Sequence, residues 1–316
     1  MTKMFKAGLI ATALLAPGAA FAQGTFIPTP TTGDVRPNPP HFTQTSANVF
    51  RRMLVETRPK MIEFYAKVLA VQSLNPINFD NGAQMILFKI GSGQIKLATG
   101  QQGNRKYHPG QLNEVTGIRT FMLTYPDEAA LTARFTAAGY PAPAFKDIGG
   151  GRRGALVQDP GGFWIGLIVD PKASPDTGVE VGINVSDLAR SRKFYREFVG
   201  LEELPPVRDT LLGVTKYPYR RGQTTISLWS VGKNLPQDTG SAGIQYVIDN
   251  VVEVDARGKA WKIPVESPLS DLKGFALRTV WLNDPDGVTN YFAQVGVRPG
   301  AAAAPAVATP AAPPAN

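Results

Sequence analysis

The sequence predicts an α+β fold made of four βαβββ modules, and three observations lead to it. A strand that runs directly into an amphipathic helix spans 181–204, and this unit recurs along the chain. The pair Phe-Tyr stands at 64–65 and again at 194–195, inside helices with matching patterns. The turn sequences DPGG at 159–162 and DPDG at 284–287 lie 125 residues apart. Each half of the chain therefore contains the strand–helix–strands unit twice.

The repeat also predicts where the domains begin and end. Grouping neighbouring modules gives two tandem domains at 47–172 and 177–298. A Pro/Thr-rich leader covers 23–46 and is expected to be extended. An Ala/Pro-rich segment covers 299–316, and its low complexity predicts a disordered tail or tether.

The first residues have the pattern of an export signal. Lys3 and Lys6 precede an apolar run over 7–20, and a small-residue A-x-A pattern ends at Ala22. This order of charge, apolar core and cleavage site is typical of a secretory signal peptide. We therefore expect residues 1–22 to be removed and the protein to be secreted, with the bacterial periplasm as the expected compartment.

Composition and charge limit the classes of function. The chain has 316 residues, of which 43% are hydrophobic and 18% charged, as expected for globular domains. Its net charge is +8, but the basic residues are scattered pairs such as Arg152-Arg153 and do not form a stripe. This distribution argues against nucleic-acid binding and favours an anionic small ligand or an envelope polymer. The absence of cysteine excludes disulfides, thiolate nucleophiles and thiolate metal sites.

The elements of the first two modules follow from alternation and from helix-capping residues. Pro59 stands in the first turn of the first helix, where its missing N–H is not needed. Asp127 is a suitable N-cap for the second helix, and Gly139 is a suitable end for it. The strands are expected at 50–56, 85–90, 94–99, 118–125, 155–158 and 163–169, and the helices at 57–71 and 128–139.

The last two modules repeat this order. Val181, Ile183 and Val185 alternate with small or polar residues, which predicts a strand with one buried face. Asp187 can cap the helix that follows, and Gly200 stands where that helix should end. The strands are expected at 181–185, 213–219, 224–230, 244–248, 276–282 and 289–295, and the helices at 188–199 and 251–260.

With these elements in place, the sequence resembles the vicinal oxygen chelate superfamily, which contains glyoxalase I, extradiol dioxygenases and the fosfomycin- and bleomycin-resistance proteins. The resemblance lies in NVSDLARSRKFYREFVGLEEL (184–204) with VWLNDPDGVTNYFAQ (280–294), and in ETRPKMIEFYAKVLAV (56–71) with ALVQDPGGFWIGLIV (155–169). It covers nearly all of the chain after the leader. It implies two tandem glyoxalase-like domains, each an open eight-stranded sheet around a cavity.

The resemblance also implies a divalent metal held in each cavity by His, Glu or Gln from the first and last strands of each module. The matching positions hold Phe50, Lys96, Thr120 and Gly166 in the first domain, and Glu180, Ser227, Gly243 and Tyr291 in the second. A divalent site needs three or four nitrogen or carboxylate ligands. The two histidines, His41 and His108, lie outside these positions. We therefore expect no metal cofactor.

Two sets of side chains are candidates for a site. Glu180 is either an exposed strand-end carboxylate or a base or hydrogen-bond anchor in the second cavity, beside the phenol of Tyr291 and the hydroxyl of Ser227. Arg52 and Lys96 either bind an anion in the first cavity or lie on a solvated strand face. The ligand-binding candidates are Phe50, Arg52, Lys96, Thr120, Trp164 and Gln245.

Three functions remain open. The first is a metal-free protein that binds a small aromatic or anionic compound. The second is a lyase, isomerase or dioxygenase with an unusual or metal-independent site around Glu180 and Tyr291. The third is a structural or interaction module of the cell envelope. The expected partner is a small molecule, without nucleic acid and without a membrane span in the mature chain, and the sequence leaves the oligomeric state open.

Overall fold

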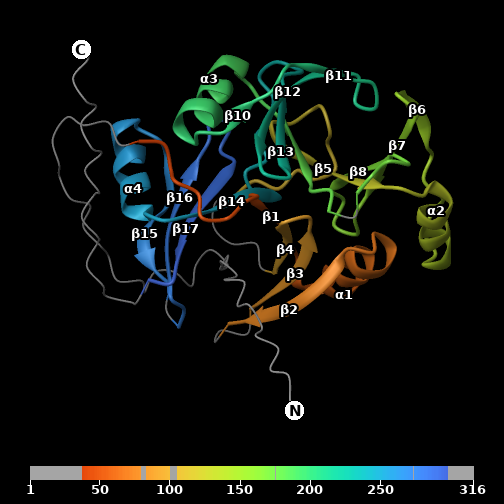
Figure 1. Ribbon diagram of the computed structural model, residues 1–316, viewed down its shortest axis with the longest axis horizontal. Coiled ribbons are helices and arrows are strands. Elements are labelled where there is room, and N and C mark those ends of the chain that lie inside the picture. The colour runs from red at the N-terminus through yellow and green to blue at the C-terminus, as the bar shows by residue number, and fades with distance from the viewer. Residues whose placement is uncertain (1–37, 80–82, 100–104, 175, 273, 298–316) are drawn as a thin grey trace, which may run out of the picture.

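The computed structural model describes residues 38–79, 83–99, 105–174, 176–272 and 274–297 (Figure 1). The predicted signal peptide, most of the leader and the Ala/Pro-rich segment lie outside these residues. No helix within the described ranges is long and apolar enough to cross a membrane.

The chain forms two mixed β-sheets, named sheet A and sheet B here. Sheet A has eight strands in the order β15-β16-β17-β14-β1-β4-β3-β2. Its strands are β1 (Asn48–Met53), β2 (Gln72–Asn78), β3 (Gln84–Ile90), β4 (Gly93–Thr99), β14 (Ala242–Ile248), β15 (Val265–Asp271), β16 (Leu277–Asn283) and β17 (Thr289–Val295).

Sheet B has the order β10-β12-β13-β9-β5-β8-β7-β6, with the short strand β11 paired to β12. Its strands are β5 (Gly117–Tyr125), β6 (Lys146–Gly149), β7 (Arg152–Gln158), β8 (Trp164–Val169), β9 (Glu180–Asn184), β10 (Glu202–Glu203), β11 (Val207–Asp209), β12 (Val214–Arg221) and β13 (Thr224–Trp229). The predicted α+β class with two curled sheets is confirmed.

The modules pair differently from their order in the chain. Sheet A joins the first module to the fourth through antiparallel β1 and β14, and sheet B joins the second to the third through antiparallel β5 and β9. Each sheet therefore takes one module from the range 47–172 and one from 177–298. The repeat alone does not decide this pairing, because any two first strands can form the same ladder of hydrogen bonds.

The four helices begin and end close to the predicted residues. They are α1 (Arg58–Glu63), which continues as a π-helical turn over Phe64–Val68, α2 (Glu128–Ala137), α3 (Leu188–Lys193), which continues likewise over Phe194–Phe198, and α4 (Val251–Ala260). The side chains of Asp127 and Asp187 cap α2 and α3 by accepting from the backbone N–H three residues later. Gly200 ends its helix at φ +82°, as a left-handed C-cap requires.

Five strands were not predicted, namely β2, β6, β10, β11 and β15. Strand β2 contains Pro76 and β15 contains Pro268, and both have register shifts against their neighbours. Both also form the edges of sheet A, where proline is tolerated because one side of the strand needs no hydrogen bond. These strands therefore lack the alternation that identifies a half-buried strand.

The two sheets meet at the doubled turns that first indicated the repeat. In the DPGG turn, Asp159 Oδ1 accepts from the backbone of Gly161 and Phe163 at 2.8 and 3.0 Å. In the DPDG turn, Asp284 Oδ1 accepts from Asp286 and Val288, both at 2.9 Å. Across the junction, Tyr65 donates to Asp159 at 3.3 Å and Tyr195 to Asp284 at 2.8 Å. The repeated tyrosines and aspartates are therefore equivalent contacts between the two sheets.

Candidate functional site

Each sheet has one face covered by helices and one inner face. On β1, Val49 and Met53 pack in the large core with the helices, so the alternate residues Asn48, Phe50 and Arg52 lie on the inner face. Phe50 belongs to a second apolar cluster with residues of β3, β14, β16 and β17, including Trp281 and Tyr291. A third cluster, around Met122 and Trp229, lies on the inner face of sheet B.

Phe50 fills the centre of the inner face of sheet A. It stands opposite Gly243 on β14 and opposite Lys96 on β4. A Cβ atom at Gly243 would overlap the Phe50 ring, so the ring lies directly on this glycine. The guanidinium carbon of Arg52 lies 4.8 Å from the ring centroid, which is a cation–π contact.

Arg52 belongs to a polar group at one end of this face, named the Arg52 cluster here and formed by Arg52, Arg105, Tyr107, Glu266 and Thr289. Arg52 lies 3.6 Å from Glu266 and donates to Thr289 Oγ1 at 3.1 Å. Arg105 also binds Glu266. Burial, with Arg105 next in importance, lowers the pKa of Arg52 to about 10, while Glu266 acts in the opposite direction. Two guanidinium groups thus share one carboxylate.

Tyr107 completes the Arg52 cluster. Its hydroxyl is buried and makes no hydrogen bond to any residue in the described part of the chain. Burial raises the pKa of Tyr107, while Arg52 and Arg105 oppose this rise. A buried hydroxyl without a partner is costly, so a bound group that accepts its hydrogen bond would be favoured here.

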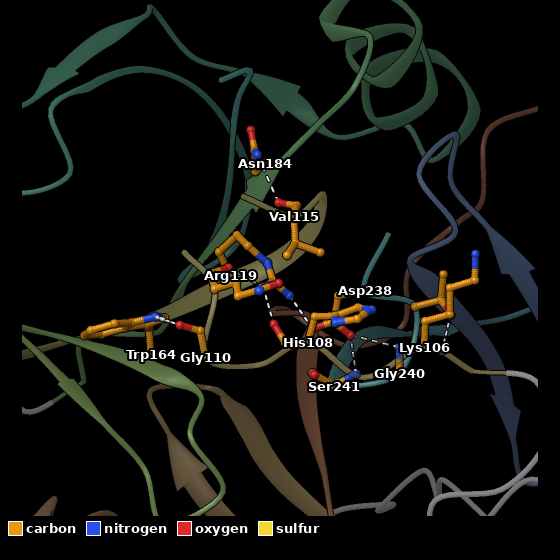
Figure 2. A network of polar contacts seen from close by, with 12 residues as sticks. Lys106, His108, Gly110, Val115, Arg119, Trp164, Asn184, Asp238, Gly240 and Ser241 are labelled. Carbon is orange, nitrogen blue, oxygen red and sulfur yellow. Dashed lines mark hydrogen bonds and ion pairs between the residues drawn. The ribbon is translucent and has the colours of Figure 1, made fainter. Parts of the chain in front are cut away.

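A polar network positions this cluster from the loop before β5 (Figure 2). In Figure 2, Arg119 reaches both Asp238 and His108: it forms an ion pair with Asp238 and donates to the carbonyl of His108 at 2.8 Å. Asp238 in turn accepts from the backbone of Gly240 and Ser241. Because Arg119 lies on sheet B and Asp238 precedes β14 of sheet A, this ion pair joins the two sheets. Arg119 also donates to the carbonyls of His108 and Gln111, which lie in the loop that carries Arg105 and Tyr107.

Lys96 and Tyr291 are two more of the predicted residues on this face, and both are almost fully buried. Burial lowers the pKa of Lys96 to about 7. Burial also raises the pKa of Tyr291, with Gln245 and Thr279 acting in the opposite direction. Gln245 accepts from Asn48 at 3.0 Å and stands next to Tyr291 in the strand register. The structure thus brings together Phe50, Arg52, Lys96, Gln245 and Tyr291.

The inner face of sheet B holds the remaining candidates. Gly182 on β9 lies between Ser227 on β13 and Thr120 on β5, and the Trp229 ring covers it as Phe50 covers Gly243. The hydroxyls of Ser227 and Thr120 and the indole N–H of Trp229 are buried and make no hydrogen bond to any described residue. Trp164, at the start of β8, is half-buried and donates to the carbonyl of Gly110 at 3.2 Å.

Glu180 does not form the predicted pair with Tyr291. Glu180 lies on β9 of sheet B and Tyr291 on β17 of sheet A, because the modules do not pair in chain order. Glu180 instead binds the ammonium of Lys216, which also lies 2.7 Å from Asp209. The strand register further shows that Gly182, not Glu180, is the equivalent of Phe50.

The residues at the metal-ligand positions of the fold do not fit a divalent cation. On sheet A these positions hold Phe50, Lys96, Gly243 and Tyr291, and on sheet B they hold Gly182, Ser227, Thr120 and Gly166. Neither set contains the nitrogen and carboxylate ligands that such an ion prefers. Within the described ranges, no three His, Asp or Glu side chains gather closely enough to hold a metal ion.

Sequence reasoning missed Arg105, Tyr107, Glu266 and Lys216. The first two lie in a loop with no motif, and Glu266 lies on the unpredicted strand β15. Lys216 lies on a predicted strand, but its ion pair with Glu180 joins β12 to β9 across the intervening strand β13, and the sequence does not show this proximity. A search for charged residues near the ends of inner-face strands could have found Lys216, whereas no local signal indicates the other three.

Comparison with known proteins places the fold. No protein-family model and no curated protein sequence matches this chain. Glyoxalase I from Zea mays is similar in structure, with a TM-score of 0.61 and 20% sequence identity over 80% of this chain and 92% of that chain. A putative dioxygenase from Bacillus subtilis is similar with a TM-score of 0.55 and 14% identity over 80% of this chain and 86% of that chain. The chain therefore has the two-domain vicinal oxygen chelate fold that glyoxalase I and the dioxygenases share.

Proposed function

We propose that this protein binds a small anion with an apolar body on the inner face of sheet A, without a metal ion. The observation that carries the proposal is the Arg52 cluster, in which two buried or nearly buried arginines share a single carboxylate beside aromatic side chains. A ligand carboxylate would add a second negative charge to this pair of guanidinium groups.

The charges near the cluster support this assignment. Asp238 is the other acid close to Arg52, but it is bound by Arg119. Glu266 is thus shared between Arg52 and Arg105, whose side chains are 5% and 13% exposed. At a pKa of about 10, Arg52 remains charged at neutral pH. Charge-assisted hydrogen bonds from two guanidinium groups are among the strongest that a carboxylate can accept.

Aromatic side chains provide the apolar part of the site. Phe50 and Trp281 lie beside the two arginines, with guanidinium-to-ring distances of 4.8 and 5.9 Å. Trp281 also packs against Tyr291 with their ring centroids 5.0 Å apart. A pocket that combines aromatic side chains with a few fixed polar groups is the usual form of a small-molecule site. An aromatic carboxylate therefore matches this face, because its ring can pack against the aromatic side chains and its carboxylate can bind the two arginines.

The other two hypotheses have less support. The enzyme hypothesis relied on Glu180 and Tyr291 in one cavity, and these residues lie in different sheets. A purely structural role gives no reason for the buried charges of the Arg52 cluster or for the buried hydroxyl of Tyr107. The export signal predicted over 1–22 would place ligand binding in the periplasm, which is part of the proposal.

Thermal stabilisation by matched ligands tests the proposal. The chelator-treated protein is heated with phenylacetate, with its neutral amide phenylacetamide, and with acetate. We expect phenylacetate to raise Tm clearly, and the amide and acetate to do so weakly or not at all, because one lacks the charge and the other the ring. Arg52→Met should abolish the shift. Arg220→Met, at an exposed ion pair on sheet B, is the matched control and should keep it. No shift with phenylacetate would contradict the proposal.

A further inference from the structure

The two turns at the junction of the sheets share one backbone arrangement but differ in charge. In the DPGG turn (159–162) and the DPDG turn (284–287), the first aspartate accepts from two backbone N–H groups of its own turn and from a tyrosine of the other sheet. In the DPGG turn, Arg51 donates to Asp159 at 3.0 Å and to the carbonyl of Gly161 at 3.1 Å. One buried cation thus balances the one buried acid of this turn.

The DPDG turn lacks such a cation. The strand register places Ile183 on β9 at the position that Arg51 occupies on β1. Ile183 is fully buried in the large apolar core, and its side chain offers no donor to a carboxylate. Neither Asp284 nor Asp286 forms an ion pair with any residue that the structure describes.

The DPDG turn also carries an additional acid. Asp286 stands where the DPGG turn has Gly161, and Asp284 and Asp286 are 2% and 0% exposed. Asp286 accepts from the backbone N–H of Ser186 at 3.0 Å and from the hydroxyl of Ser191 at 3.4 Å, so it faces the start of α3. Ionising two carboxylates in one buried turn that has only neutral donors is costly.

Asp284 is the group of this turn that titrates near neutral pH. Burial, with Asp286 next in importance, raises the pKa of Asp284 to about 7, while the hydrogen bonds from the backbone and from Tyr195 act in the opposite direction. The other titratable groups that act on Asp284 are Tyr195, in the helical turn after α3, and Tyr246 on β14. Burial raises the pKa of both tyrosines well above the usual value, so both stay neutral in this range.

We propose that the DPDG turn is a proton-operated latch between α3 and β17, closed while the turn carries a proton and loosened when both of its carboxylates are ionised. The DPGG turn is the permanent contact, because Arg51 gives its acid a buried counter-charge. Raising the pH therefore loosens one of the two junctions and leaves the other closed. This inference is independent of the ligand proposed for sheet A.

Amide hydrogen exchange on the intact chain tests the latch, with the DPGG turn as the control within the same molecule. The protein is labelled at pH 6 and pH 8, and the exchange rates of peptides containing 159–163 and 284–288 are corrected for the intrinsic rate at each pH. A carboxyl with a pKa of about 7 in the closed turn and about 3.9 in the open turn loses about tenfold in the ratio of closed to open forms over this range. We therefore expect protection of 284–288 to fall about tenfold and that of 159–163 to stay constant.

Two variants identify the titrating group. Asp284→Asn cannot ionise and keeps an oxygen acceptor for the backbone N–H groups, so its turn should be equally protected at pH 6 and pH 8. Asp286→Asn removes the second carboxylate, so the loss of protection should occur at a lower pH than in the wild type. Equal pH dependence of the two turns, no pH dependence of 284–288, or a wild-type profile in Asp284→Asn would overturn the proposal.

Discussion

Arg52 carries its guanidinium carbon 4.8 Å from the centre of the Phe50 ring, and that ring lies on Gly243. Phe50 and Arg52 are successive inner-face residues of β1, so this one strand supplies both an apolar ring and a positive charge to the proposed site. Sheet B repeats the aromatic ring on a glycine, with Trp229 on Gly182, but without an arginine at the corresponding place. The proposed ligand site therefore belongs to sheet A alone.

Adding a methyl group beneath the Phe50 ring should destabilise the protein. In Gly243→Ala the new Cβ overlaps the ring, so the ring or the strand must move, at a cost of about 1–3 kcal/mol. Urea unfolding measures the loss. The double variant with Phe50→Leu should recover part of it, because the smaller side chain leaves room. Gly110→Ala, whose Cβ meets nothing closer than 3.6 Å, is the control and should change little.

Lys96 should make the stability of the fold depend on pH. Because burial lowers its pKa to about 7, the folded chain releases this proton more readily than the unfolded chain, and wild-type stability should increase as pH rises from about 7 towards 10. Lys96→Met removes this titrating group, so its free energy of unfolding should change less between pH 7 and pH 9 than that of the wild type.

The matched control for Lys96 is the other buried lysine. Lys216→Met leaves Glu180 and Asp209 without their shared cation and should destabilise the protein at the same pH. Unfolding by urea at pH 7 and pH 9 compares the two. Equal effects of the two substitutions would contradict the distinction between these lysines.

Asp284 should make the junction between the sheets sensitive to pH. Burial, with Asp286 second, raises its pKa to about 7. The folded chain then binds this proton more tightly than the unfolded chain, so the stabilisation is complete below about pH 4 and is lost as pH rises to about 7. Asp284→Asn should flatten that part of the profile of unfolding free energy against pH.

The equivalent residue in the other turn is a control with the opposite expectation. Asp159 pairs with buried Arg51 at 3.0 Å, so Asp159→Asn should be destabilising at pH 7 by about 3 kcal/mol or more. A pH profile of Asp284→Asn that keeps the wild-type slope would show that Asp284 is not the titrating group.

Tyr107→Phe should weaken the ligand while leaving the fold unchanged. Its hydroxyl makes no hydrogen bond to a described residue, so its loss leaves no protein group newly unpaired. We expect the Kd for phenylacetate to rise about 3- to 20-fold, equivalent to one lost hydrogen bond, with Tm of the free protein within about one degree of wild type. An unchanged Kd would remove Tyr107 from the site.

The sequence was sufficient for the modules but not for their pairing. The range 251–260 is the observed α4, and the doubled turns and Phe-Tyr pairs occupy equivalent places in the two halves. Periodicity reports which residues of a strand share a face, and the positions implied by the family resemblance include Phe50 and Lys96, which are neighbours in the strand register. It carries no information on which first strands meet, so the expected Glu180–Tyr291 pair was wrong. Arg105 and Glu266 reach Arg52 from a loop and an edge strand, and only the folded chain brings them together.

Calorimetric titration of phenylacetate into the chelator-treated full chain tests the central claim most directly. We predict saturable binding to one site per chain, unchanged when zinc, manganese, nickel or iron(II) is added, and at least tenfold weaker in Arg52→Met. Binding that appears only with an added metal, or that survives Arg52→Met unchanged, would contradict the account.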